Sequence, residues 1–122
     1  MTLTHLAAFA AACALGGAGR FLLTRLISGR HQGTFPLPTL VVNLSGAFLA
    51  GLIYTSVEGD TLRLLLLIGF CGCYTTISTF GLETVRLARL GAPHIAALNV
   101  MLSLFGSLLA AVLGLNLGRL AA

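Results

Sequence analysis

The chain has 122 residues, of which 57% are hydrophobic and only 8% are charged. Soluble domains carry about 25% charged residues, so this composition indicates an integral membrane protein and excludes an ordinary soluble domain. The formal net charge of +4 is small and its arginines are scattered, which gives no indication of nucleic-acid binding. We expect one membrane domain that covers residues 1–122.

Four apolar segments are long enough to cross a bilayer as helices, which takes about 20 residues each. Gly or Pro residues separate these segments, and four spans place both termini on one side. Two arginines, Arg63 and Arg119, lie on that side and four lie on the other, a weak bias that permits insertion in both orientations. The expected spans are residues about 3–27, 40–57, 62–90 and 94–117.

Arg20 of the first span and Glu83 of the third are the two charged residues placed deepest in the apolar segments. The first and third spans run in the same direction, and each residue lies in the last half of its span. Isolated charges are costly in hydrocarbon. We therefore expect Arg20 and Glu83 to face each other or to share a vestibule.

Uncharged polar side chains lie inside the second and fourth spans. Asn43 sits within a run of Val, Leu and Phe, where it either joins two helices or offers its NH2 group to an anion. Asn99, Ser103 and Ser107 follow at four-residue spacing, on one helical face. Serines in membrane helices commonly bond back to their own helix. Three polar residues in register favour a polar pathway over that alternative.

The third span contains a polar run, Gly72 to Phe80, with three Thr and one Ser. These residue types are poor in helix interiors, so we expect a break near residues 72–77. Broken helices at membrane depth commonly form ion or substrate sites. The ring edge of Phe80, which is electropositive, could favour an anion without a fixed charge. The run therefore indicates a transport function.

No motif for hydrolysis, metal catalysis or nucleotide binding is present, and the three His residues do not cluster. We therefore expect a protein that is not an enzyme. The three cysteines fit small packing residues. A small multidrug-resistance-type, proton-coupled exporter has a similar length and stays as the alternative. Its chemistry needs a carboxylate in the first span, and this span has no Asp or Glu.

The combined pattern resembles the Fluc (CrcB) family of fluoride channels. The resemblance rests on three motifs, of which the third is highly specific, and their order and spacing cover nearly the whole chain. They are residues 16–20 (GGAGR), residues 33–46 (GT, then TLVVNLSG) and residues 69–80 (GFCGCYTTISTF) followed by Glu83.

The resemblance implies an all-α integral membrane fold with four transmembrane helices per subunit, assembled as an antiparallel, dual-topology homodimer. It implies passive fluoride export through two pathways at the dimer interface, in the inner (plasma) membrane. It also implies a structural sodium ion at the dimer centre, held by the backbone carbonyls of Gly72 and Thr75. The pathway residues carried over are Asn43, Ile77, Ser78, Thr79, Phe80, Ser103 and Ser107.

One position departs from the family pattern. The family usually has two Phe residues three positions apart, whose ring edges line the pathway. Phe80 keeps the second of them, but Ile77 stands in place of the first. Because Ile has no ring quadrupole, an anion at that point would depend on hydroxyl and amide donors. Asn99 is a second residue whose role the resemblance does not supply.

Overall fold

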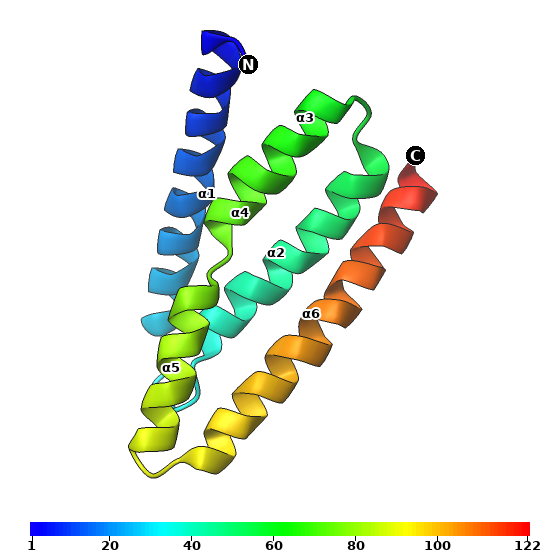
Figure 1. Ribbon diagram of the computed structural model, residues 1–122. Helices are drawn as coiled ribbons and strands as arrows, with labels where there is room; N and C mark the ends of the chain where they lie inside the picture. Colours follow the sequence, from blue (N-terminus) through cyan, green and yellow to red (C-terminus); the bar gives the residue numbers. More distant parts are fainter.

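The computed structural model describes residues 1–122 and is entirely helical (Figure 1). Four helical rods are long and apolar enough to cross a membrane, and the third is bent, as the sequence predicts. Both termini lie at the same end of the bundle (Figure 1). The elements are α1 (Leu3–Ser28), α2 (Leu37–Ser56), α3 (Asp60–Leu64), η1 (Leu65–Cys71), α4 (Gly72–Tyr74), α5 (Ile77–Arg89) and α6 (Pro93–Ala121).

The ends of the rods follow local sequence signals. Thr2 caps α1, because its hydroxyl accepts a hydrogen bond from the backbone N–H of His5. Helix α2 begins at Leu37, three residues before the expected start, and Pro38 occupies its first turn, where no backbone N–H is needed. Gly91 has a φ of +82° in the turn before α6, a conformation that favours glycine.

Helices α2 and α6 pack along each other through glycine. A Cβ atom on Gly51 would overlap the carbonyl of Ala111, and one on Gly114 would overlap the carbonyl of Phe48. Side chains at these positions would force the two backbones apart. Because lipid provides no hydrophobic drive for helix association, such close approach supplies the packing.

Helix α1 packs in the same way against the third rod. A Cβ atom on Gly16 would overlap the carbonyl of Phe70, and a Cβ on Gly69 would lie 3.0 Å from the Cβ of Ala12. The adjacent Gly17 has open space around it. One glycine of the Gly16–Gly17 pair is therefore required by packing and the other is not.

The third rod is interrupted at Thr75 and Thr76, inside the range expected from the sequence. Thr75 has φ −79° and ψ 162°, and Thr76 has φ −147° and ψ 112°, so both residues are extended. Thr76 then caps α5, because its hydroxyl accepts a hydrogen bond from the N–H of Thr79 at 3.2 Å. Before the break, Leu65–Cys71 forms a π-helix, which the sequence reasoning missed.

Candidate functional site

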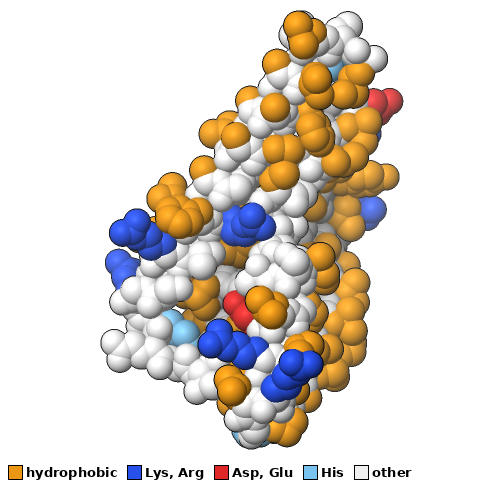
Figure 2. All heavy atoms as spheres, turned by 60° about the vertical axis from the view of Figure 1, so that its left-hand side comes forward, with side chains coloured by type: hydrophobic (Ala, Val, Ile, Leu, Met, Phe, Trp, Pro, Cys, Tyr) orange, Lys and Arg blue, Asp and Glu red, His pale blue; other side chains and the backbone are white.

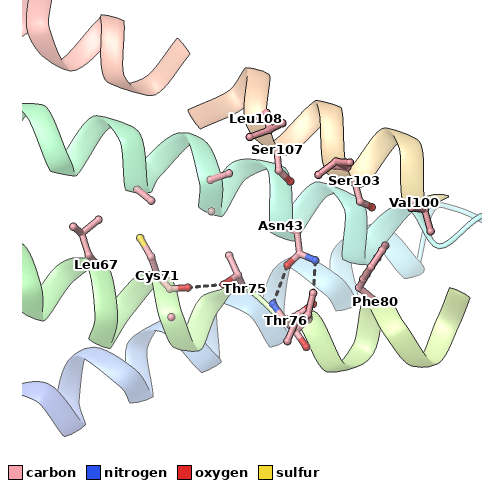
Figure 3. A pocket seen from close by; sticks show the side chains of 16 residues that line it. Asn43, Leu67, Cys71, Thr75, Thr76, Phe80, Val100, Ser103, Ser107 and Leu108 are labelled. Atoms are coloured by element: carbon pink, nitrogen blue, oxygen red, sulfur yellow. Dashed lines mark hydrogen bonds between the residues drawn. The ribbon is translucent and has the colours of Figure 1, made fainter. Parts of the chain in front are cut away.

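A groove of about 690 Å³ lies between α2, the third rod and α6 (Figure 3). Nine of its sixteen lining residues are hydrophobic and none is charged, so any ion within it meets only uncharged groups. The structure brings five of the seven expected pathway residues to this groove, together with both residues expected to bind sodium. They are Asn43, Ile77, Phe80, Ser103 and Ser107, with Gly72 and Thr75.

Asn43 connects α2 to the break in the third rod. The backbone N–H of Thr76 donates to its Oδ1 at 2.8 Å, and its Nδ2 donates to the carbonyl of Thr76 at 3.0 Å (Figure 3). The amide thus satisfies two backbone groups that the break leaves without helical partners. Nδ2 carries a second N–H, which has no acceptor within the subunit. Asn43 therefore joins two helices and also retains a donor at the groove.

The two serines of α6 do not bond back to their own helix carbonyls. Ser103 Oγ donates to Oδ1 of Asn99 at 3.5 Å, and the hydroxyl of Ser107 forms no hydrogen bond within the subunit. The Phe80 ring extends toward α2 and α6 from α5 (Figure 3). The groove therefore combines an aromatic ring with hydroxyl donors that are weakly bonded or free.

Ile77 begins α5 at the edge of the groove. Its side chain is 81% exposed in the subunit, although it lies at the break in the middle of the third span. Nothing within the subunit packs tightly around it. Ile77, which stands where the family usually has a Phe, can therefore be covered only by lipid or by a second chain.

Ser78 and Thr79 lie elsewhere. They line a second cavity of about 420 Å³, together with Arg20 and Glu83. Thr76 borders both this cavity, which we call the vestibule, and the groove. Figure 2 shows basic side chains on either side of a hollow that contains an acidic one. The structure therefore divides the expected pathway residues between two cavities that meet at Thr76.

Arg20 and Glu83 share the vestibule without forming an ion pair. Arg20 Nη1 donates to the carbonyl of Thr75 at 3.2 Å, and Thr39 Oγ1 donates to Glu83 Oε1 at 2.9 Å. The other carboxyl oxygen of Glu83 is buried and has no partner within the subunit. The two charges are therefore held separately, the arginine at the break and the carboxyl group against α2.

The break also leaves carbonyl oxygens that suit a hard cation. The N–H groups of Thr75 and Thr76 donate to Cys71 and Asn43 instead of to Gly72, so the carbonyl of Gly72 receives no bond from them. The carbonyl of Thr75 accepts from Arg20 alone, and a carbonyl has two lone pairs. Carbonyl oxygen is a ligand type that Na⁺ takes at unwound membrane helices. The two residues therefore fit the expected ion.

Sequence reasoning missed the roles of three residues, one lining the vestibule and two next to the site. Thr39 holds the Glu83 carboxyl group, Tyr74 bonds to Ser45 at 2.8 Å, and Thr84 accepts from Asn99 at 3.0 Å. Thr39 lies four residues before Asn43 on one helical face, and this spacing was the available signal. The Thr84–Asn99 pair joins different helices, so no local spacing predicts it.

Comparison with known proteins agrees with this geometry. A family model described as "CrcB-like protein, Camphor Resistance (CrcB)" matches residues 7–115. The chain is 42% identical over 108 residues to the "Fluoride-specific ion channel FluC" of Methylocella silvestris, covering 83% of this chain and 82% of that protein. It is 39% identical over 113 residues to the protein of the same name from Coxiella burnetii strain CbuK_Q154, covering 88% and 91% of the two chains.

A further relative, "Fluoride-specific ion channel FluC 2" of Moorella thermoacetica, is 46% identical over 102 residues, or 81% of this chain and 84% of that protein. The matched region includes most of the first and fourth rods, all of the second and third, the break at Thr75–Thr76 and both cavities. The four-span helical architecture and the family match lead to the same conclusion. The chain belongs to the CrcB-like protein family and is a multi-pass membrane protein.

Proposed function

We propose that the chain forms a passive, fluoride-selective ion channel. The observation that carries this proposal is the uncharged groove, where the Phe80 ring, Ser107 and the second N–H of Asn43 meet the break in a membrane helix. The curated relatives that are named fluoride-specific ion channels support the choice of ion. The geometry offers nothing for catalysis.

The chemistry follows from the size of the ion. Fluoride is the smallest halide and is strongly hydrated, so a selective pathway must replace its water with hydrogen-bond donors. Hydroxyl and amide groups supply these donors without net charge, and an aromatic ring edge adds a positive partial charge. Conduction also needs binding that is weak enough for the ion to leave. A groove without charged side chains meets both conditions.

Two copies of the chain assemble as an antiparallel homodimer in this proposal. The groove is open on one side of the subunit, and Ile77 at its edge is 81% exposed. A second copy placed over this face closes the groove and covers the side chain. The small arginine bias between the two ends allows both orientations. Two equivalent pathways follow from the symmetry of such a dimer.

A sodium ion at the centre of this dimer is part of the proposal. The carbonyls of Gly72 and Thr75 from both chains would hold it, and it would supply fixed positive charge and join the two breaks. Two observations support this site. The carbonyl oxygen of Gly72 accepts no hydrogen bond from the N–H groups of Thr75 and Thr76, and the carbonyl oxygen of Thr75 retains one free lone pair.

The channel would act in the inner (plasma) membrane. Undissociated HF crosses lipid and ionises inside the cell, so a passive leak for the anion lowers internal fluoride. The proton-coupled exporter is not favoured, because α1 contains no Asp or Glu for proton exchange.

The test uses purified protein in liposomes loaded with either potassium fluoride or potassium chloride. A potassium ionophore starts efflux, and ion-selective electrodes follow each anion. We expect rapid fluoride efflux and no chloride efflux above that of protein-free vesicles. Equal loss of both anions, or no loss from vesicles that contain assembled protein, would reject the channel.

A further inference from the structure

Asn99 is buried beside the groove without lining it. It lies on α6 one turn before Ser103, and only 2% of its surface is exposed. Its Nδ2 donates to Thr84 Oγ1 of α5 at 3.0 Å, and its Oδ1 accepts from Ser103 Oγ at 3.5 Å. Thr84 in turn donates to the carbonyl of Phe80 at 2.7 Å. One buried amide therefore connects the wall that carries Phe80 with the hydroxyl of Ser103.

Ser103 makes an unusual choice of acceptor. A serine in a membrane helix commonly bonds to a backbone carbonyl three or four residues earlier, and four residues before Ser103 is Asn99. Here the hydroxyl takes the side-chain oxygen of Asn99 instead, at the outer limit of hydrogen-bonding distance. A bond this long is weak, so the hydroxyl can exchange it for another acceptor at small cost.

The amide of Asn99 is itself fixed in orientation. Its donor side is committed to Thr84, whose own hydrogen is directed to Phe80. The amide therefore presents its oxygen, and not its NH2 group, to Ser103. A reversed amide would place a donor against the hydroxyl and turn the hydrogen of Ser103 elsewhere.

We propose that Asn99 is a positioning residue that keeps the Ser103 hydroxyl available as a donor to an anion in the groove. It does so by offering a weak side-chain acceptor in place of the helix carbonyl. This inference rests on the proposed fluoride channel. Leucine at position 99 has a similar volume but no acceptor, so the hydroxyl of Ser103 falls back onto its own helix and is lost to the anion.

The test is a double-mutant cycle on the initial rate of fluoride efflux from liposomes. We expect Asn99→Leu and Ser103→Ala each to lower the rate about tenfold, because each removes one hydrogen bond to an ion. We expect the double variant to conduct no more slowly than Ser103→Ala alone. Asn116→Leu is the matched control, since Asn116 lies on the same helix and bonds only to the carbonyl of Val112.

Two results would overturn the inference. The first is an efflux rate in Asn99→Leu that equals the wild-type rate. The second is a fall in efflux rate on Asn99→Leu that is the same in the wild-type background and in the Ser103→Ala background. The second result would show that Asn99 contributes through packing alone. Asn99→Ala is measured in the same cycle, because it also removes the acceptor for Ser103 and can replace Asn99→Leu if the leucine variant does not assemble. A wild-type protein that does not conduct overturns the proposed function itself, whereas a conducting wild type without coupling overturns this inference alone.

Discussion

Asn43 and Thr76 are joined by two hydrogen bonds, one to each backbone polar group of Thr76, at 2.8 and 3.0 Å. A side chain of α2 thereby replaces the partners that a continuous helix would have provided. The break in the third rod is thus a fully bonded structure at this residue. Thr76 itself is buried within the subunit, so protein and not lipid surrounds its backbone.

Replacing Asn43 by alanine should therefore affect both stability and conduction. Asn43→Ala leaves the N–H and carbonyl of Thr76 without partners and removes one donor from the groove. We expect the free energy of unfolding to fall by about 2 kcal/mol or more and fluoride efflux to fall more than tenfold, with the proposed dimer still assembled. Denaturation in detergent and liposome efflux measure the two effects. Asn116→Ala, at a site away from the break, should change neither.

The aromatic ring of Phe80 supplies a second prediction. Phe80→Ile removes the electropositive ring edge while leaving an apolar side chain in the groove, so fluoride efflux should fall at least tenfold. Size-exclusion chromatography should still show the wild-type oligomer. Wild-type efflux from this variant would remove the ring edge from the mechanism.

Ile77 provides the reciprocal change. Ile77→Phe restores the second ring of the family pattern, and nothing within the subunit obstructs it, because Ile77 is 81% exposed. We expect the variant to assemble and to conduct at least as fast as wild type in the same efflux assay. A variant that fails to assemble would show that the partner surface is fitted to isoleucine.

Gly16 and Gly17 offer a matched pair for the packing of α1. A Cβ on Gly16 overlaps the carbonyl of Phe70, whereas a Cβ on Gly17 has open space. Gly16→Ala should lower the free energy of unfolding by about 1–3 kcal/mol through overpacking. Gly17→Ala should leave it unchanged or raise it by about 0.5–1 kcal/mol, because alanine favours the helix. Equal effects of the two substitutions would contradict the packing described for α1.

The carboxyl group of Glu83 depends on Thr39 for its one hydrogen bond in the subunit. Thr39→Val removes that bond with little change of shape. A bond to an ionised carboxylate contributes about 1.5–3 kcal/mol and a neutral one about 0.5–1.5 kcal/mol. Thr39→Val should therefore cost more unfolding free energy in the wild-type protein than in the Glu83→Gln background. Thermal unfolding of the four proteins measures this, and identical losses would refute it.

The proposed sodium ion predicts a cation-dependent stability. Exchange of sodium for N-methyl-D-glucamine at constant ionic strength should lower the thermal unfolding midpoint, because a bound ion stabilises only the folded state. Re-addition of sodium should restore the midpoint with a saturable dependence on concentration. A midpoint that is the same in both cations would argue against the site at Gly72 and Thr75.

The sequence predicted the spans and the break because these depend on local chemistry. Apolar length fixes the four rods, and the Thr/Ser run from Thr75 to Thr79 disfavours a continuous helix. The division of the pathway residues into two cavities was not predictable in this way. Ser78 and Thr79 adjoin Ile77 in sequence, but α5 turns them toward the vestibule while Ile77 faces the groove.

Interactions between distant residues were also beyond the reach of the sequence. Arg20 and Glu83 have opposite charges and similar depth, from which we expected them to face each other or to share a vestibule, and both line the same cavity. The sequence did not show that each bonds to a neutral partner, Arg20 to the Thr75 carbonyl and Glu83 to the Thr39 hydroxyl. Which partner each side chain bonds depends on the distances between side chains on three different helices. The periodicity of the sequence carries no information about these distances.

The π-helix Leu65–Cys71 has a geometric consequence for the whole subunit. At its end the N–H of Gly72 reaches back five residues to the carbonyl of Leu67, so the coil holds a surplus residue compared with an α-helix. One residue corresponds to a rotation of about 100° around the axis. The extra residue therefore determines the direction around the helix axis in which the carbonyls of Gly72 and Thr75 point. If the same seven residues followed an ordinary α-helix, those carbonyls would point about 100° away from their present direction, although no residue of any motif had changed.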